Sequence, residues 1–194
     1  MSIKTAELIN DEKQRTEQFL IAKRRIEEKR AEKKGLHNEM EMTFAAISSN
    51  EAFARVAVAA FVSPLNPTLE EISDIKTAVS EAVTNAIIHG YDEEYQKAVP
   101  AIRGNKVKLS CLLEGDVLHV EVRDEGKGIE NIKQAMEPLF TTKPQLDRSG
   151  MGFAFMEAFM DDLEVISRPG FGTTVLMKKK MGTSPWVKLN EEER

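Results

Sequence analysis

Residues 81–90 combine a carboxylate, a carboxamide and an imidazole at a spacing of four. On a helix, Glu81, Asn85 and His89 share one polar stripe. Mg²⁺ prefers oxygen ligands and retains several waters, so the Asn85 carboxamide together with phosphate oxygens suits it. Glu81, one turn away, is placed to accept a proton from an attacking hydroxyl group, while His89 is interpreted as a helix-end residue. Without further motifs, a solvated polar helix face is the simpler interpretation.

An acidic residue followed by two glycines comes next, in Asp124-Glu-Gly126-Lys-Gly128-Ile129. Asp124 stands where a predicted strand ends, and its carboxylate is suited to accept a hydrogen bond from an exocyclic amine such as adenine N6. Gly126 and Gly128 allow a sharp backbone turn and leave room for a flat base. Taken alone this motif is weak, and a simple turn explains it better.

A third motif, Gly150-Met151-Gly152-Phe153, opens a predicted helix. Free amides at a helix N-terminus bind phosphate, and glycines permit close approach of the backbone. The preceding cations Lys143 and Arg148 are suited to neutralise phosphate charge. An ordinary glycine-bearing helix start is an equally good interpretation of this element in isolation, and it is not a Walker loop.

Two threonines complete the set. Thr142 lies in a segment between the glycine motifs that is suited to close over phosphates as a lid. Thr173 begins the last predicted strand and either reaches the base or merely favours β structure. Each element is modest, but their order indicates one nucleotide site assembled from four separated segments.

Local signals define the elements that position these residues. Thr68 and Glu71 form a capping box that opens a long helix reaching His89, and Gly90 ends it. A second helix over residues 50–61 is predicted to turn Phe53, Val56, Ala57 and Ala60 inward. The other predicted elements are strands at residues 43–47, 106–113, 117–123, 163–167 and 173–179 and a helix at residues 150–160. This order predicts an α/β (α+β) two-layer sandwich with helices on one face of a mixed, mainly antiparallel sheet.

Bulk properties narrow the class of protein. The net charge of −5 argues against a nucleic-acid binder, and the single cysteine, Cys111, excludes an internal disulfide. No apolar stretch is long enough for a membrane span, so we expect a cytoplasmic protein. We divide the chain into a charged extension, helical or disordered, at residues 1–36, a globular domain at residues 37–181 and a tail at residues 182–194.

These motifs, in this order, resemble the GHKL ATPase superfamily with its Bergerat-type ATP-binding fold. Residues 80–91, 138–144 and 148–153 are more narrowly similar to the anti-sigma F factors of endospore-forming bacteria, as are residues 50–55. The resemblance covers about residues 38–180. It implies a homodimeric protein serine kinase (EC 2.7.11.1) that uses ATP and Mg²⁺ and also binds ADP.

The family binds and inhibits the sporulation sigma factor F when loaded with ATP, and it phosphorylates an anti-anti-sigma factor on serine. By resemblance, Glu81 is the general base, Asn85 the Mg²⁺ ligand, and Arg55 part of the surface that binds both protein partners. The resemblance places the nucleotide against Asn85, Asp124, Gly126, Gly128, Ile129, Thr142, Lys143, Arg148, Ser149, Gly150, Met151, Gly152, Phe153 and Thr173.

Two departures and several alternatives stay open. Residues 1–35 precede the family's usual start near Leu36, as a genuine arm or a translated leader, and the connection at residues 92–105 is longer than usual. The alternatives are the anti-sigma kinase of the stress-response sigma B system, a nucleotide-gated binding protein without turnover, and the catalytic domain of a histidine kinase. The histidine kinase requires a phosphoacceptor histidine on a preceding helix, and the arm before Leu36 contains none.

Overall fold

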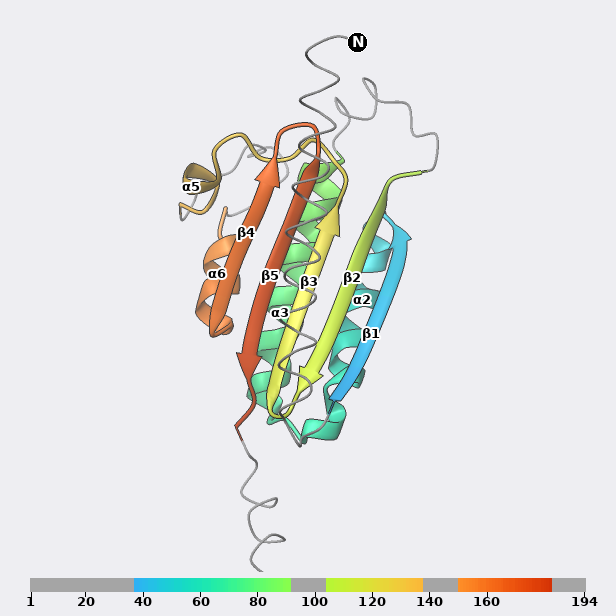
Figure 1. The fold of residues 1–194 in the computed structure, drawn as a ribbon, viewed down its shortest axis with the longest axis vertical. Helices are drawn as coiled ribbons and strands as arrows, with labels where there is room; N and C mark the ends of the chain where they lie inside the picture. Colours follow the sequence, from blue (N-terminus) through green and yellow to red (C-terminus); the bar gives the residue numbers. More distant parts are fainter. Residues whose placement is uncertain (1–36, 92–103, 138–149, 183–194) are drawn as a thin grey trace, which may run out of the picture. The chain divides into compact units, whose positions relative to one another are not determined.

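A computed structural model describes residues 37–91, 104–137 and 150–182 of the chain. Five strands form one sheet in the order β1-β2-β3-β5-β4, with every neighbouring pair antiparallel (Figure 1). The strands are β1 (His37–Ala45), β2 (Lys106–Glu114), β3 (Val117–Asp124), β4 (Asp162–Arg168) and β5 (Gly172–Lys180). The predicted two-layer sandwich is confirmed, although the sheet is antiparallel throughout its described strands rather than mixed.

The helices α2 (Ser49–Phe61), α3 (Leu69–Asn85) and α6 (Gly152–Phe159) lie on one face of the sheet (Figure 1). Shorter helical turns are η1 (Ser63–Leu65), η2 (Ala86–Gly90) and α5 (Ile132–Ala135). Both α2 and α6 pack against α3, which therefore lies in the centre of the helical layer. None of the helices in the described part of the chain has the length and apolar character that crossing a bilayer requires.

The helix α3 begins at the predicted capping box. The backbone N–H of Thr68 donates to Glu71 Oε2 over 2.7 Å, and the backbone N–H of Glu71 donates to Thr68 Oγ1 over 3.1 Å. Its buried stripe is Ile75, Ala78, Val79, Ala82 and Val83, as the helical spacing predicts. The helix does not end there, because residues Ala86–Gly90 continue it as one π-helical turn.

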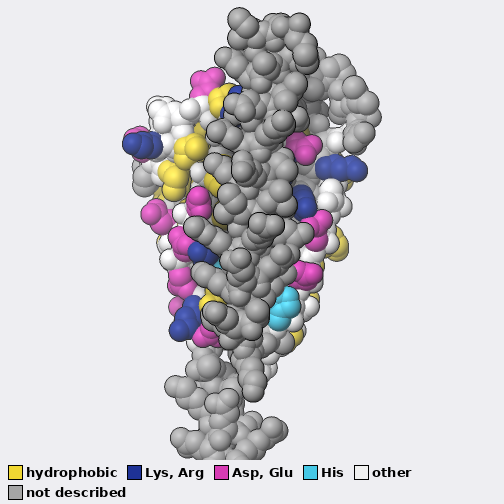
Figure 2. Space-filling view, in the orientation of Figure 1, with side chains coloured by type: hydrophobic (Ala, Val, Ile, Leu, Met, Phe, Trp, Pro, Cys, Tyr) yellow, Lys and Arg dark blue, Asp and Glu magenta, His cyan; other side chains and the backbone are white. Residues whose placement is uncertain are grey.

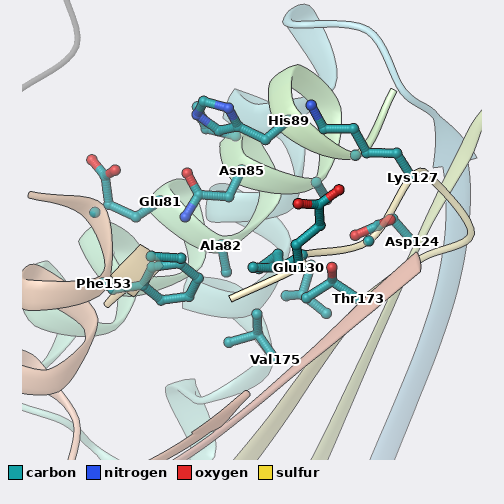
Figure 3. A pocket seen from close by; sticks show the side chains of 18 of the residues that line it. Glu81, Ala82, Asn85, His89, Asp124, Lys127, Glu130, Phe153, Thr173 and Val175 are labelled. Atoms are coloured by element: carbon teal, nitrogen blue, oxygen red, sulfur yellow. The ribbon is translucent and has the colours of Figure 1, made fainter. Parts of the chain in front are cut away.

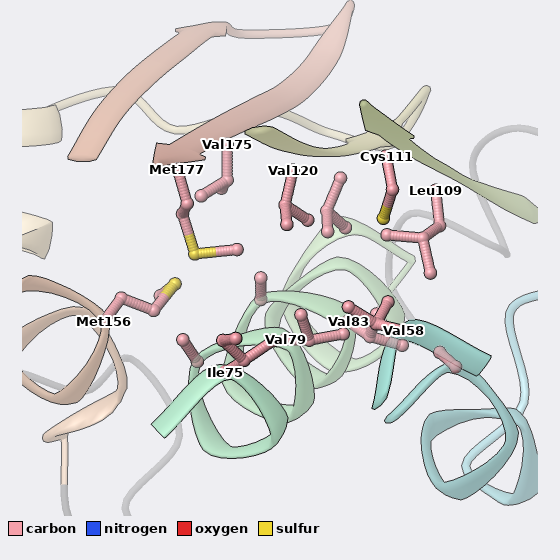
Figure 4. Close-up of a cluster of buried hydrophobic side chains, with 14 of the residues drawn as sticks. Val58, Ile75, Val79, Val83, Leu109, Cys111, Val120, Met156, Val175 and Met177 are labelled. Carbon is pink, nitrogen blue, oxygen red and sulfur yellow. The ribbon is translucent and has the colours of Figure 1, made fainter. Parts of the chain in front are cut away.

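The core lies between this stripe and the inner face of the sheet. Leu109 and Cys111 of β2, Val120 of β3 and Val175 and Met177 of β5 point toward the helices (Figure 4). The alternation along each strand explains this, since successive side chains point to opposite faces. The last four predicted strands match β2, β3, β4 and β5 closely, and β1 starts earlier than predicted, at His37.

One packing prediction is wrong. The side chains of Phe53 and Val56 on α2 are 54% and 62% exposed, whereas Ala54 and Val58 are fully buried. Both stripes of α2 are apolar, so periodicity alone does not distinguish them. The helix packs against α3 and buries its Ala54 and Val58 side, and Ala60 of the predicted inward stripe is exposed as well.

Charged side chains of both signs lie interspersed over the described surface that Figure 2 shows. Several form exposed pairs, such as Lys108 with Glu41 at 2.9 Å and Lys178 with Asp162 at 2.9 Å. Such exposed pairs contribute little to stability because water screens them.

Candidate functional site

A cavity of about 590 Å³ opens between α3, η2, residues 127–131 and residues 150–153. Its size is typical of pockets for small molecules. Figure 3 shows Glu81, Asn85 and His89 in one row along the helix, with Asp124 and Thr173 across from them. The predicted site residues that line the cavity are Glu81, Asn85, Asp124, Gly128, Ile129, Gly150, Met151, Gly152, Phe153 and Thr173.

The Glu81 carboxylate and the Asn85 carboxamide of α3 face the start of α6. A Cβ atom built on Gly152 would lie 2.9 Å from Glu81 Oε2 and 3.3 Å from Asn85 Nδ2. Two segments far apart in the sequence are therefore in contact here, with glycine between them. A side chain at residue 152 would require the Glu81 carboxylate to shift, so glycine leaves this space free for both polar groups and for a ligand.

Asp124 ends β3 inside the cavity wall. It is 4% exposed and is the one buried charged side chain in the described part of the chain. Burial raises the pKa of its carboxyl group to about 6, partly offset by hydrogen bonds from the backbone N–H groups of Gly126 and Thr173. The Gly126 N–H donates to Oδ1 over 2.8 Å. A desolvated carboxylate beside an apolar wall is suited to pair with an amine or amidine edge.

The glycines after Asp124 are required by close backbone contacts. A Cβ on Gly126 would lie 2.1 Å from the Gly90 carbonyl oxygen, and one on Gly128 would lie 2.1 Å from that of Arg168. Gly126 does not itself line the cavity, but it lets residues 124–128 pack against η2. The Lys127 N–H donates to the Gly90 carbonyl over 2.8 Å, which fixes this arrangement.

Ser167 on β4 connects Ile129, the residue after the second glycine, with Thr173. Its hydroxyl accepts the Ile129 N–H over 2.8 Å and lies 2.8 Å from Thr173 Oγ1. This role has no signal in the sequence, because a serine in a strand near a sheet edge has no distinctive spacing. The Thr173 side chain is therefore paired with the Ser167 hydroxyl, while its backbone belongs to β5.

Sequence reasoning missed further cavity residues. It assigns His89 only a helix-end role, whereas His89 lies in the cavity wall, as do Lys127, Glu130, Asn131 and Gln134. For His89 the spacing of four from Asn85 is the available signal. The others follow Gly126 in segments whose path depends on the close backbone contacts of the two glycines, so the sequence alone does not reveal them.

The predicted lid residues Thr142, Lys143, Arg148 and Ser149 lie outside the described residues. Within the described part of the chain, no three His, Cys, Asp or Glu side chains gather as they do in an all-protein metal site. Mg²⁺ would therefore depend on Asn85 and on oxygens of the ligand itself, as it does where it binds with phosphates. The Asn85 carboxamide fits this, because it faces the start of α6 where free amides favour phosphate.

Arg55 lies on α2 and does not line the cavity. Its Nη1 is 3.5 Å from Glu51 Oε1, and its side chain is 39% exposed. The Ser80 hydroxyl, on α3, donates to the same Glu51 oxygen. Arg55 is therefore accessible to a protein partner and is connected to α3 through Glu51.

Comparisons with known proteins give one family of domains and one kind of relative. Residues 44–179 match the family model of the histidine kinase-like ATPase domain. The chain is 52% identical over 152 residues to the anti-sigma F factor of Oceanobacillus iheyensis, covering 78% of this chain and 99% of that protein. It is 57% identical to the anti-sigma F factor of Clostridium acetobutylicum over 145 residues, covering 75% and 95%.

The anti-sigma F factor of Bacillus subtilis is 51% identical over 149 residues, with 77% of this chain and 97% of that protein covered. Among solved structures, the RsbU and RsbW domains of Rv1364c from Mycobacterium tuberculosis align with a TM-score of 0.52 at 19% identity. That alignment covers 74% of this chain and 32% of the other, longer chain, and it supports the fold alone.

Proposed function

The chain belongs to the family of the anti-sigma F factors and carries a histidine kinase-like ATPase domain, and from this we propose that it is an ATP-dependent anti-sigma factor and protein serine kinase. In this proposal it binds and inhibits sigma factor F when loaded with ATP. It also phosphorylates a serine of the anti-anti-sigma factor. The observation that carries the proposal is the cavity in which a buried Asp124 faces the Glu81 and Asn85 stripe.

The inner end of the cavity suits adenine. The Asp124 carboxylate would accept a hydrogen bond from the exocyclic amine of the base, which would compensate for its burial. Ala82, Ala86, Val122 and Val175 supply the apolar wall for a flat ring. Thr173 and Ile129 lie beside this end and would complete the contact with the base.

The other end suits the phosphates. The amides of Gly152 and Phe153 at the start of α6 would bind phosphate oxygens, and Asn85 would contribute a ligand to Mg²⁺. Lys143 and Arg148 would add positive charge, with Thr142 and Ser149 in the lid. When bound, Mg·ATP supplies the transferable phosphoryl group and a cation that offsets its charge.

Glu81 completes the chemistry. Its carboxylate would accept the proton of the incoming serine hydroxyl, because it lies on the cavity wall one turn from Asn85. Most of the rate acceleration would come from positioning and charge neutralisation, as in other phosphoryl transfers. Arg55 would contact the protein partners, and the chain would act as a homodimer in the cytoplasm.

Replacing Glu81 with Gln tests the role of the base. We expect phosphorylation of the anti-anti-sigma factor to be lost while ATP affinity is nearly retained, since Gln has the same shape but does not accept the proton. Radiolabel transfer and calorimetric titration measure the two quantities. Glu157→Gln, at an exposed position of α6, is the matched control and should behave as wild type. Full activity of the Glu81→Gln variant would remove Glu81 from this role.

The anti-sigma kinase of the sigma B system is the second candidate. The three curated relatives are all anti-sigma F factors, which favours sigma factor F as the client. Co-purification of each sigma factor with this chain, with ATP and without nucleotide, distinguishes the two. ATP-dependent retention of sigma B but not of sigma F would replace the proposed client.

A further inference from the structure

Three side chains connect α2 with the helix turn that carries Glu81. The Ser80 hydroxyl of α3 donates to Glu51 Oε1 of α2, and the same oxygen lies 3.5 Å from Arg55 Nη1. We refer to Ser80, Glu51 and Arg55 as the α2–α3 bridge. None of the three lines the cavity, yet Ser80 directly precedes the proposed base.

Neighbouring positions of a helix point about 100° apart, so the bond of Ser80 to α2 helps to set where Glu81 points into the cavity. The Glu51 side chain is 21% exposed, and the hydrogen bond from Ser80 is part-buried. A hydrogen bond to a charged group in such a place is stronger than one in open water. The bridge is therefore suited to fix the rotation of this turn of α3.

The outer end of the bridge is open to a partner. Arg55 is 39% exposed, and its separation of 3.5 Å from Glu51 is longer than that of a close ion pair. A carboxylate from a docked protein would compete with Glu51 for the guanidinium group, which binds carboxylates in a two-pronged geometry. Glu51 would then keep Ser80 as its remaining contact within the bridge.

We propose that the α2–α3 bridge positions Glu81 and couples its position to the occupancy of Arg55. Glu51 and Ser80 are then positioning residues for phosphoryl transfer, in addition to any part that they take in folding. This inference rests on the proposed kinase function. It differs from a purely structural role because it predicts an effect on turnover that is separate from nucleotide binding and from folding.

The first experiment breaks the inner contact. We expect Ser80→Ala and Glu51→Ala each to lower kcat for phosphorylation about 3- to 10-fold, the loss of roughly one hydrogen bond, with ATP affinity unchanged and the protein still fully folded at the assay temperature. Ser80→Thr, which keeps the hydroxyl, should restore kcat, and the double alanine variant should be no slower than either single one. Thr77→Ala is the matched control, since the Thr77 hydroxyl donates over 2.9 Å to Ser73 of its own helix.

The second experiment examines the outer contact. Arg55→Ala should raise KM for the anti-anti-sigma factor and also lower kcat. In a Glu51→Ala background the KM effect should remain, whereas the kcat effect should disappear because the bridge is already broken. Equal kcat losses in both backgrounds would show that Arg55 affects turnover independently of the bridge, and no kcat loss at all would show that Arg55 acts only as a contact. Either result would overturn the coupling.

The outcomes separate this inference from the proposed function. If the wild-type chain binds ATP but phosphorylates no serine, the proposed function fails and the inference fails with it. If the wild-type chain is an active kinase and Ser80→Ala leaves kcat unchanged, or Thr77→Ala lowers it equally, the inference alone is rejected.

Discussion

At the scale of single residues, the site contains groups whose positions lower the stability of the protein as long as no ligand is bound. Asp124 is a carboxylate buried at 4% exposure, and Gly152 leaves a space between Glu81 and the start of α6. Both features lower the stability of the folded protein relative to a site that is filled with apolar side chains. Such losses of stability are common at functional sites, because binding requires preformed space and charge.

Gly152→Ala tests the importance of the space between Glu81 and the start of α6. The added methyl group would lie 2.9 Å from Glu81 Oε2, so the carboxylate must move. We expect phosphorylation to fall roughly 10- to 100-fold, as small misplacements of a reacting group often cause. The unfolding temperature should not fall, because alanine is favoured over glycine in a helix.

Gly182→Ala is the control, with a Cβ at 3.4 Å from Glu71 Oε1 and no contact with the cavity. Equal activity of the Gly152→Ala and Gly182→Ala variants would show that the close approach to Glu81 has no catalytic importance.

Asp124→Asn tests the buried charge through pH. The folded-state pKa of Asp124 is about 6, above its ordinary value of 3.8. Between these values the folded state binds more protons than the unfolded state, so the free energy of unfolding decreases as pH rises. Every tenfold difference in proton affinity between the two states corresponds to roughly 1.4 kcal/mol. Denaturant titrations of the nucleotide-free protein from pH 4 to pH 7 should therefore show a smaller decrease for Asp124→Asn than for wild type. Parallel curves would contradict the raised pKa.

At the scale of elements, α3 and its π-helical extension organise the site. The capping box fixes where the helix begins, and the buried stripe fixes which face is turned toward the sheet. The π-helical turn at Ala86–Gly90 then brings the Gly90 carbonyl to the Lys127 N–H. Short π-helical insertions are often found at functional sites, where they reorient the following residues.

Thr68→Ala tests the start of α3. Loss of the side-chain cap should lower the free energy of unfolding by about 1 kcal/mol. Thr68→Ser retains the hydroxyl and should lose much less, which denaturant titration will show. If both variants unfold as wild type does, then packing rather than the cap defines the start of the helix.

Sequence reasoning recovered the elements whose signals are local. The capping box identified the start of α3, and the predicted strands at residues 106–113, 117–123, 163–167 and 173–179 match β2, β3, β4 and β5. The orientation of α2 was wrong because Phe53 and Val56 form a stripe as apolar as the one that is buried. The π-helical turn, Ser167 and the place of Lys127 depend on contacts between segments distant in sequence, which no local pattern records.

At the scale of the whole molecule, the described residues form one helical layer on one antiparallel sheet (Figure 1). The cavity lies at the end of α3 that carries Glu81 and Asn85, whose side chains Figure 3 shows. The edges of the cavity come from six elements, which are β3, β5, α3, η2, α5 and the start of α6. A ligand that bridges these elements would stabilise the fold by mass action. The proposed chemistry thus depends on a nucleotide held between Asp124 and the start of α6.

Calorimetric titration of the folded protein with ADP and Mg²⁺, at two temperatures, measures whether the cavity holds that nucleotide. We expect saturable binding of about one nucleotide per chain and a negative heat-capacity change from burial of the base. We further expect loss of that binding in an Asp124→Ala variant, which removes the hydrogen-bond acceptor. Absence of heat at both temperatures, or unchanged affinity in Asp124→Ala, would refute a nucleotide site in this cavity.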